Sequence, residues 1–281
     1  MTTQRRAVVV GVDGTDSARH AAEWAARRAA EMGRELVLVY GMRLPMHVDT
    51  HLHAPVDVTS GEPMRRWAAD MVDDVARRCR EVASVEVRTE VADGDPADVV
   101  ILAADRPEFV VVGRSETGGL ARFLLGSTSE RLARACPWPV VVVPEDAPGG
   151  DREGPVVVGV DGTATGWQAL DFALRFASWC GAEVVVLHAS DGDDGSTVGH
   201  DVLRAEFDGV VGTRPDVRVR TVVTADDPAD ALLDAAEDAR LLVVGSHGKG
   251  AAKRMFVGSV SHDVVERAPC PVAVLPPQTA S

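Results

Sequence analysis

The sequence predicts an α/β fold, built as two tandem, open and mostly parallel sheets with helices on both faces. Apolar, β-branched runs alternate with segments of helical character, an order typical of parallel sheets that are covered on both sides. One such run occurs twice, together with the turn that follows it. Hydrophobic residues make up 46% of the chain but aromatic residues only 4%. The cores must therefore consist mainly of Val, Ala and Leu, which suit strands buried on both faces.

An internal repeat divides the chain into two copies. The segment Val8 to Thr15 recurs unchanged 148 residues later, as Val156 to Thr163. Farther along, the offset is 132 residues, as in Gly126-Ser127 and Gly258-Ser259. The smaller offset places extra sequence in the first copy.

The extra sequence and the connection between the copies are both expected to lie outside regular structure. Residues from Met42 to Arg66 are rich in His, Pro and Asp and predict a loop. The stretch from Glu145 to Gly154 has the Pro, Gly and charged residues of an exposed linker. We therefore expect one domain over residues 1–147 and a second over residues 152–281.

Each copy is expected to hold five strands with helices between them. The expected strands are residues 8–12, 36–40, 85–91, 109–112 and 140–143, and then 156–160, 184–188, 217–223, 241–244 and 272–275. The first helices are expected over Ala18–Met32 and Gly166–Cys180, each followed by a glycine that suits a helix end. A later helix follows Asp-Pro-Ala-Asp in both copies, where Asp can cap and Pro fits the first turn.

A glycine-rich segment of the second copy predicts a phosphate-binding loop. Gly245-Ser246-His247-Gly248 is followed, after nine residues, by Gly258-Ser259-Val260-Ser261. Glycine lets main-chain N–H groups approach phosphate oxygens, and the start of a helix favours an anion. The serine hydroxyls can donate to phosphates, and three cations of the loop add positive charge: Lys249, Lys253 and Arg254. A glycine-rich connector followed by a serine cap is the structural alternative.

The turn after the first strand places a carboxylate near this loop. In open parallel sheets, ligands bind beyond the carboxyl ends of the strands, and Asp13 and Asp161 lie there in the two copies. Each carboxylate can accept hydrogen bonds from a ribose or a base. Asp-Gly is equally a turn signal, so both interpretations stay open.

The chain resembles the universal stress protein family, twice and over nearly its whole length. The resemblance rests on Val-Gly-Val-Asp-Gly of the first strand and its turn, the G-x-x-G-x(9)-G-S loop and the Pro-Val strand at each domain end. It implies a five-stranded Rossmann-like sheet in each copy and ATP, with or without Mg²⁺, between the strand-one Asp, the end of strand two and the strand-four loop. In the second copy the implied binding residues are Asp161, Ala189, Gly245, His247, Gly248, Gly258, Ser259, Val260 and Ser261. In the first copy they are Asp13, Gly41, Gly113, Ser115, Gly126, Ser127, Thr128 and Ser129.

The first copy departs from the loop pattern. Glu116 occupies the position of the second glycine. At about 4 Å from a phosphate, charge repulsion would cost about 4 kcal/mol at an effective dielectric near 20. The cost is avoided if the side chain faces solvent or a divalent cation bridges it to the phosphates. Ser127 and Glu130 also fit a capping box that brings negative charge to the helix start. Arg114 and Arg122 supply the cations of this loop. We expect the second copy to bind nucleotide more tightly.

Three functions are compatible with these features. The leading hypothesis is an ATP-binding regulatory protein of the stress response, because no nucleophile or water-activating base is recognisable. A slow ATPase, or an autophosphorylating enzyme with Ser259 or Ser261 as acceptor, is the second. The third is a nucleotide-independent dimerisation scaffold. The family resemblance implies that domains pair through their last strands, here within one chain, and two chains could pair again as a homodimer.

Composition narrows the partners and the location. A net charge of −14 argues against binding nucleic acid, which requires Lys and Arg to neutralise phosphates. The polar N-terminus and a short apolar run broken by Asp13 predict neither a signal peptide nor a membrane span, hence a cytoplasmic protein. The four cysteines form no C-x-x-C pair and are expected to be buried, reduced thiols.

Other cofactor motifs are weak or missing in the sequence. Neither G-x-x-x-x-G-K-[ST] nor G-x-G-x-x-G follows the first strand, which disfavours a P-loop NTPase and a dinucleotide dehydrogenase. His47, His51 and His53 cluster in the extra loop of the first copy. A solvated or pocket-covering loop is the simpler interpretation, and a metal site with Asp49 or Asp57 is the alternative.

Overall fold

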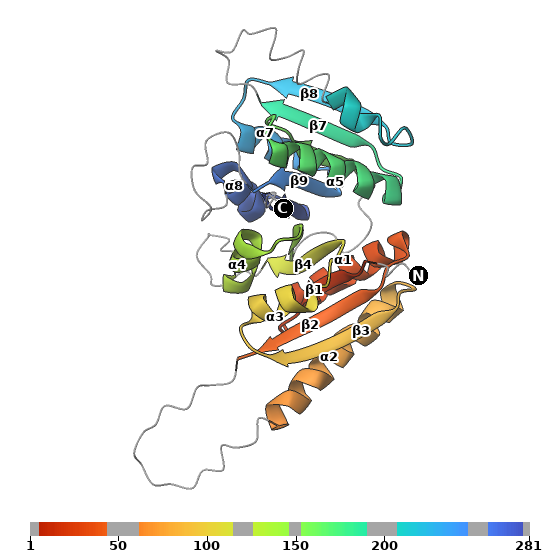
Figure 1. The fold of residues 1–281 in the computed structure, drawn as a ribbon, viewed down its shortest axis with the longest axis vertical. Coiled ribbons are helices and arrows are strands. Elements are labelled where there is room, and N and C mark those ends of the chain that lie inside the picture. The colour runs from red at the N-terminus through yellow and green to blue at the C-terminus, as the bar shows by residue number, and fades with distance from the viewer. Residues whose placement is uncertain are drawn as a thin grey trace, which may run out of the picture.

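Ten strands form one sheet that runs through both copies of the repeated sequence (Figure 1). The structure is a computed structural model, and it describes residues 6–43, 62–114, 126–145, 153–189, 207–246 and 258–277. Repeat 1 contains β1 (Val8–Gly11), β2 (Leu36–Met42), β3 (Val87–Asp93), β4 (Phe109–Arg114) and β5 (Val140–Pro144). Repeat 2 contains β6 (Val156–Gly159), β7 (Val184–Ala189), β8 (Val219–Thr224), β9 (Leu241–Gly245) and β10 (Val272–Leu275).

The sheet has an internal twofold relation. Its strand order is β3-β2-β1-β4-β5-β10-β9-β6-β7-β8. Neighbours within each half are parallel, whereas β5 and β10 are antiparallel, with Val141 facing Ala273. These two residues are 132 positions apart, the offset that relates the later parts of the copies. The predicted α/β class is confirmed, but the two separate sheets expected from the sequence are joined into one, because β5 pairs with β10.

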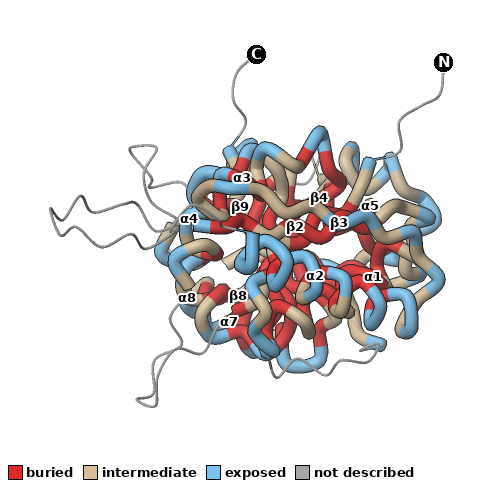
Figure 2. Tube along the Cα trace, turned by 90° about the horizontal axis from the view of Figure 1, so that it is seen from below, coloured by how far each residue is buried: buried red, intermediate tan, exposed pale blue. Residues whose placement is uncertain are grey.

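Helices cover both faces of the sheet. One face carries α1 (Asp16–Met32), α2 (Glu62–Val82), α5 (Ala164–Cys180) and the helical residues 207–211. The other carries α3 (Pro96–Ala103), α4 (Ser127–Ala135), α7 (Pro228–Ala236) and α8 (Ser259–Arg267). Successive strand residues face opposite sides, so Val8 and Val10 pack in the first layer and Val9 in the second. Buried residues consequently line the interior, and exposed residues follow the outer helices (Figure 2).

The first helices begin earlier than the sequence predicts, because a threonine caps each of them. Thr15 Oγ1 accepts a hydrogen bond from the Ala18 N–H, and Thr163 Oγ1 accepts one from the Gly166 N–H. The residues between cap and expected start are therefore helical. The predicted ends are confirmed, since Gly33 and Gly181 adopt the left-handed conformation with φ of 61° and 64°.

Two other expectations need correction. The predicted loop from Met42 to Arg66 was wrong at both ends: Met42 pairs with Asp93 in the β2–β3 ladder, and α2 begins at Glu62. Residues 44–61, with the histidine cluster, lie outside the described part of the chain. The third strands start two residues later than expected, at positions 87 and 219, where their pairing with the second strands begins. The valines before them, Val85 and Val217, still pack against the core.

An aromatic cluster joins α1 to α5 across the two repeats. Trp24 of α1 stacks on Phe176 of α5, with ring centroids 6.3 Å apart and an angle of 7° between the planes. Phe109 of β4 lies edge-on to Phe172 of α5 at 6.0 Å. Trp24 and Phe172 occupy equivalent positions, 148 residues apart, and both belong to this cluster, so equivalent faces of α1 and α5 meet there.

A buried carboxylate lies at the same junction. The side chain of Glu108 is 5% exposed, and its Oε1 is 3.1 Å from Arg34 Nη2 in repeat 1. Its other oxygen, Oε2, is 3.7 Å from Arg175 Nη1 on α5 of repeat 2. Buried charge is stable only when it is paired, so Glu108 favours the observed placement of the two repeats.

The four cysteines lie outside any disulfide, and Cys79, Cys136 and Cys270 are buried as expected, whereas Cys180 is only half-buried. Burial raises the pKa of the Cys79 thiol to about 12 and that of the Cys136 thiol to about 11. Both thiols stay protonated near neutral pH and are therefore poor nucleophiles.

Truncation at the aromatic junction is expected to destabilise the whole molecule. Phe176→Ala removes a ring that is 2% exposed, and such truncations cost about 3–5 kcal/mol. Leu102→Ala is the control, because Leu102 is 83% exposed and surface changes stay within about 0.5 kcal/mol. Urea unfolding followed by circular dichroism measures both. Equal stability of the two variants would contradict the packing described here.

Candidate functional site

In each repeat the strand order reverses at one point, between β1 and β4 in repeat 1 and between β6 and β9 in repeat 2. We call this point the crevice position. α1 leaves β1 toward one face of the sheet and α4 leaves β4 toward the other, and the same holds for α5 after β6 and α8 after β9. Chain segments diverge at this point beyond the carboxyl ends of the strands, which is where open α/β sheets bind ligands. The predicted site residues that the structure describes lie around these two positions.

The carboxylate after the first strand organises its own turn. Asp161 Oδ1 accepts hydrogen bonds from Thr163 N at 3.0 Å and from Thr163 Oγ1 at 2.7 Å. Asp13 does the same with Thr15, at 3.0 and 2.6 Å. The glycine within the turn has a φ of 80° in repeat 2, a conformation that suits glycine. Oδ1 of each carboxylate therefore stabilises the turn, as the turn interpretation expects, and a contact with a ligand would use Oδ2.

Packing requires a glycine near the carboxyl end of the fourth strand of each repeat, at Gly113 in β4 and Gly245 in β9. A Cβ on Gly113 would lie 2.5 Å from Ser17 Oγ and 2.8 Å from the Ser17 carbonyl, and one on Gly245 would lie 2.9 Å from Thr165 Cγ2. The first turn of α1 or α5 fills the space that the side chain would need. At the end of the second strand, a Cβ on Gly41 would lie 2.5 Å from Pro96 Cα.

The last helix of each repeat begins at a glycine. Gly126 and Gly258 are the N-cap residues of α4 and α8, and neither helix has a side-chain cap hydrogen bond. A helix start leaves its first N–H groups without intrahelical partners. These amides therefore face the crevice position with the positive end of the helix dipole, as a phosphate site requires.

The serines of these helices divide into two kinds. Ser261 is buried, and its hydroxyl donates to the Gly258 carbonyl at 2.9 Å. Ser129 is also buried and donates to the Gly113 carbonyl at 3.0 Å. Ser127 and Ser259, the first residues of the helices, are exposed. The hydroxyl available to a ligand is thus the one at the first helical position.

The predicted capping box of repeat 1 is wrong. The N-cap is Gly126 rather than Ser127, and the Glu130 carboxylate pairs with Arg134 one turn farther along the helix. Glu130 therefore does not occupy the N–H groups at the helix start. In repeat 2 the equivalent His262 lies 3.4 Å from Glu266.

Arg114 is not a cation of the repeat 1 loop, contrary to the sequence-based count. It is 7% exposed, and its Nη1 donates to the carbonyls of Val265 at 3.1 Å and Ala268 at 2.9 Å in repeat 2. Several other predicted residues lie outside the described part of the chain and are not placed: Ser115, Glu116, Arg122, His247, Gly248, Lys249, Lys253 and Arg254.

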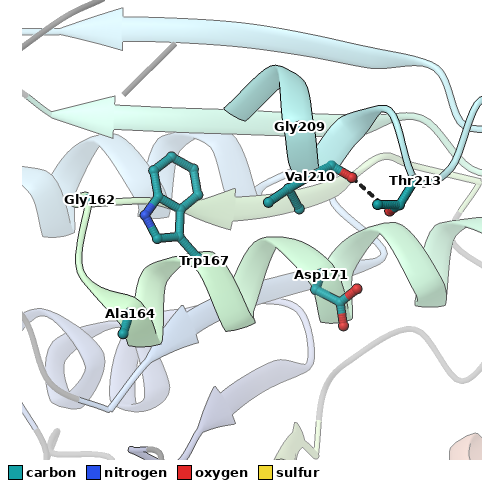
Figure 3. Close-up of a pocket in the computed structure, with 7 residues that line it drawn as sticks. All are labelled: Gly162, Ala164, Trp167, Asp171, Gly209, Val210 and Thr213. Carbon is teal, nitrogen blue, oxygen red and sulfur yellow. Dashed lines mark hydrogen bonds between the residues drawn. The ribbon is translucent and has the colours of Figure 1, made fainter. Parts of the chain in front are cut away.

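A pocket of about 710 Å³ lies beside the Asp161 turn, between α5 and the segment that carries Gly209 (Figure 3). The indole of Trp167 projects from α5 toward that segment. In repeat 1 the side chain of Met71 on α2 lies beside the equivalent turn, with its Cγ 3.5 Å from where a Cβ on Gly14 would lie. Sequence reasoning missed this pocket, and its signal was the aromatic Trp167 one turn into the first helix.

Metal and membrane features are absent from what the structure describes. Within the six described ranges, no group of three or more His, Cys, Asp or Glu residues is arranged to hold a metal ion. Among the helices with described residues, none combines the length and apolar character of a membrane span.

Comparison with known proteins gives consistent matches over the whole chain. Residues 4–144 and 154–276 each match the model of the universal stress protein family. A universal stress protein of Mycobacterium tuberculosis (strain ATCC 25618 / H37Rv) is 34% identical over 288 residues, covering 96% of this chain and 97% of the relative. One of Mycolicibacterium smegmatis (strain ATCC 700084 / mc(2)155) is 33% identical over 296 residues, with 96% and 97% covered. The crystal structure of a universal stress protein from Archaeoglobus fulgidus DSM 4304 superposes with a TM-score of 0.75 at 23% identity, covering 97% of this chain and 99% of that one.

Adding a methyl group at the end of β4 is expected to destabilise repeat 1. Gly113→Ala forces a Cβ against the Ser17 backbone, and such overpacking costs about 1–3 kcal/mol. Gly209→Ala is the matched control, because it lies in the helical residues 207–211 and a Cβ there meets nothing within 4 Å. The control should be neutral or more stable by up to about 1 kcal/mol. Thermal unfolding compares the two, and a Gly113→Ala protein as stable as the control would disprove the close approach.

Proposed function

The chain belongs to the universal stress protein family, and on that premise we propose that it is an ATP-binding regulatory protein of the stress response, with its main nucleotide site in repeat 2. The observation that carries this proposal is the start of α8. Its N-cap is a glycine without a side-chain cap, it lies at the strand-order reversal, and its first hydroxyl is exposed. Amides at such a position suit a polyphosphate.

The site is assembled from three segments of repeat 2. The main-chain N–H groups of Ser259, Val260 and Ser261 and the Ser259 hydroxyl contact the phosphates, with or without Mg²⁺. Asp161 Oδ2 accepts from the ribose, while its Oδ1 keeps the turn to Thr163. Ala189, which ends β7, borders the base.

We propose that repeat 2 binds the nucleotide more tightly because the charges near its site are more favourable to phosphate. In repeat 1 the guanidinium of Arg114 is directed to α8 and is therefore not available to a phosphate beside Gly113. The helix of repeat 1 also carries Glu130 where repeat 2 has His262. Glu130 is paired with Arg134, so we expect its contribution to be small and the loss of the arginine to matter more.

One observation favours a second candidate function, an autophosphorylating or slowly hydrolysing enzyme. Ser259 is exposed at the first helical position, whereas the Ser261 hydroxyl is committed to the Gly258 carbonyl. Ser259 is thus the better phosphate acceptor of the two. Single-turnover incubation with γ-labelled ATP distinguishes label transfer to Ser259 from simple binding.

A scaffold that dimerises through its last strands has less support. β5 and β10 already pair with each other inside the chain. Neither strand therefore has a free edge to pair with a second chain. A homodimer of this chain would therefore use a different surface from the one that joins the two repeats.

A negative charge at the start of α8 is expected to abolish tight nucleotide binding. Ser259→Asp brings a carboxylate next to the phosphates, and repulsion of about 4 kcal/mol at about 4 Å corresponds to a loss near three decades of affinity. Folding should survive, because Asp is favourable in a first helical turn. Isothermal titration of the full chain with Mg·ATP measures the effect, and Ser127→Asp in repeat 1 is the matched control, expected to leave the tight site unchanged. Unaltered affinity in Ser259→Asp would place the phosphates elsewhere.

The two roles of Asp161 can be separated from each other. Asp161→Ala removes a hydrogen-bond acceptor for the ribose, and we expect about a tenfold loss of ATP affinity. Asp13→Ala, its equivalent in repeat 1, removes the same two turn hydrogen bonds and should lose comparable stability without changing the tight site. Titration calorimetry and urea unfolding report the two effects separately. If both variants lose stability but neither loses affinity, Asp161 is a turn residue only.

A further inference from the structure

Arg114 connects the two repeats at a position that bears on the proposed nucleotide site. It is the last residue of β4 in repeat 1, and it is buried at the junction. Its guanidinium donates to the carbonyls of Val265 and Ala268, in the last turn and at the C-cap of α8 in repeat 2. The last carbonyls of a helix lack intrahelical partners, and a cation there also stabilises the negative end of the helix dipole.

The main chain around Arg114 is equally constrained, but within repeat 1. Its carbonyl accepts a hydrogen bond from the Ser17 hydroxyl of α1 at 2.9 Å. The carbonyl of the preceding Gly113 accepts one from the Ser129 hydroxyl of α4 at 3.0 Å. The backbone of Arg114 is therefore fixed by repeat 1 while its side chain fixes a helix of repeat 2.

The same helix, α8, presents the proposed phosphate site at its other end. It spans only Ser259 to Arg267, which at about 1.5 Å per residue is about 13 Å. A helix this short moves as one piece, so a displacement of its C-terminal end shifts the amides at its start. The residue equivalent to Arg114 is Ser246, so the corresponding position of repeat 2 has no positive charge for the end of α4.

We propose that Arg114 is a positioning residue for the nucleotide site of repeat 2, so that a side chain from repeat 1 sets the affinity of repeat 2. This inference rests on the proposed function. Arg114 does not touch the nucleotide; it holds α8 at the end opposite the phosphates. By reciprocity, nucleotide bound at the start of α8 stabilises the contact between the repeats.

Substitutions at Arg114 test this, with Mg·ATP titrated into the full chain by calorimetry and folding checked by urea unfolding. Arg114→Met keeps the length of the side chain without its charge and is expected to weaken ATP binding about tenfold, within the range of measured couplings between sites. Arg114→Lys retains a cation at the negative end of the α8 dipole and should stay within about threefold of the wild type. Arg175→Met is the control, because Arg175 also crosses the junction but contacts Glu108 on the α5 side. It should lose stability and keep its affinity.

The outcomes separate the inference from its premise. Wild-type affinity in a folded Arg114→Met protein, or an equal loss of affinity in Arg175→Met, overturns the role of Arg114 and leaves the proposed function intact. A wild-type chain that binds no ATP removes the proposed function itself, and the inference with it. If Arg114→Met does not fold, Arg114→Gln, which keeps a neutral donor, takes its place with the same expected loss.

Discussion

The antiparallel pairing of β5 with β10 is the constraint on which the rest of the structure depends. It is the one antiparallel pair among the strands that the structure describes, and it hides two edges that would otherwise expose unpaired N–H and C=O groups. Because equivalent residues face each other there, the pairing also sets a local twofold relation. That relation brings α1 against α5 on one face and the end of β4 against α8 on the other.

Equivalent positions of the two repeats carry different residues and make different contacts, although the strands and helices around them, the frame, are repeated. Glu108 of repeat 1 is a buried carboxylate between two arginines, while its counterpart Arg240 donates to the Gly154 carbonyl within repeat 2. Arg114 reaches the other repeat, and its counterpart is a serine. The frame is repeated, but these polar contacts across it are not.

Local patterns predicted the elements well, because strands, caps and helix ends depend on neighbours in the sequence. Asp95 and Asp227 cap the helices that begin at Pro96 and Pro228, as their motif indicated. The errors came from long-range competition. The start of α2 was missed because a polar segment precedes it, and the expected capping box was wrong because Gly126 is the N-cap. Arg114 was assigned to its own loop, although its hydrogen-bond partners lie more than 150 residues away. Such contacts depend on strand order, which hydrophobic periodicity does not encode. For the site, the sequence located the start of the last helix. It could not show that the hydroxyls of Ser129 and Ser261 donate hydrogen bonds to main-chain carbonyls.

Whether main-chain amides at the start of α8 hold the phosphates of a nucleotide can be seen in a crystal structure of the full chain grown with Mg·ATP. We expect density for the phosphates within hydrogen-bonding distance of the amides of Ser259 to Ser261, with the equivalent amides of Ser127 to Ser129 less occupied or empty. Nucleotide bound only in repeat 1, or phosphates held away from the α8 amides, would contradict this expectation.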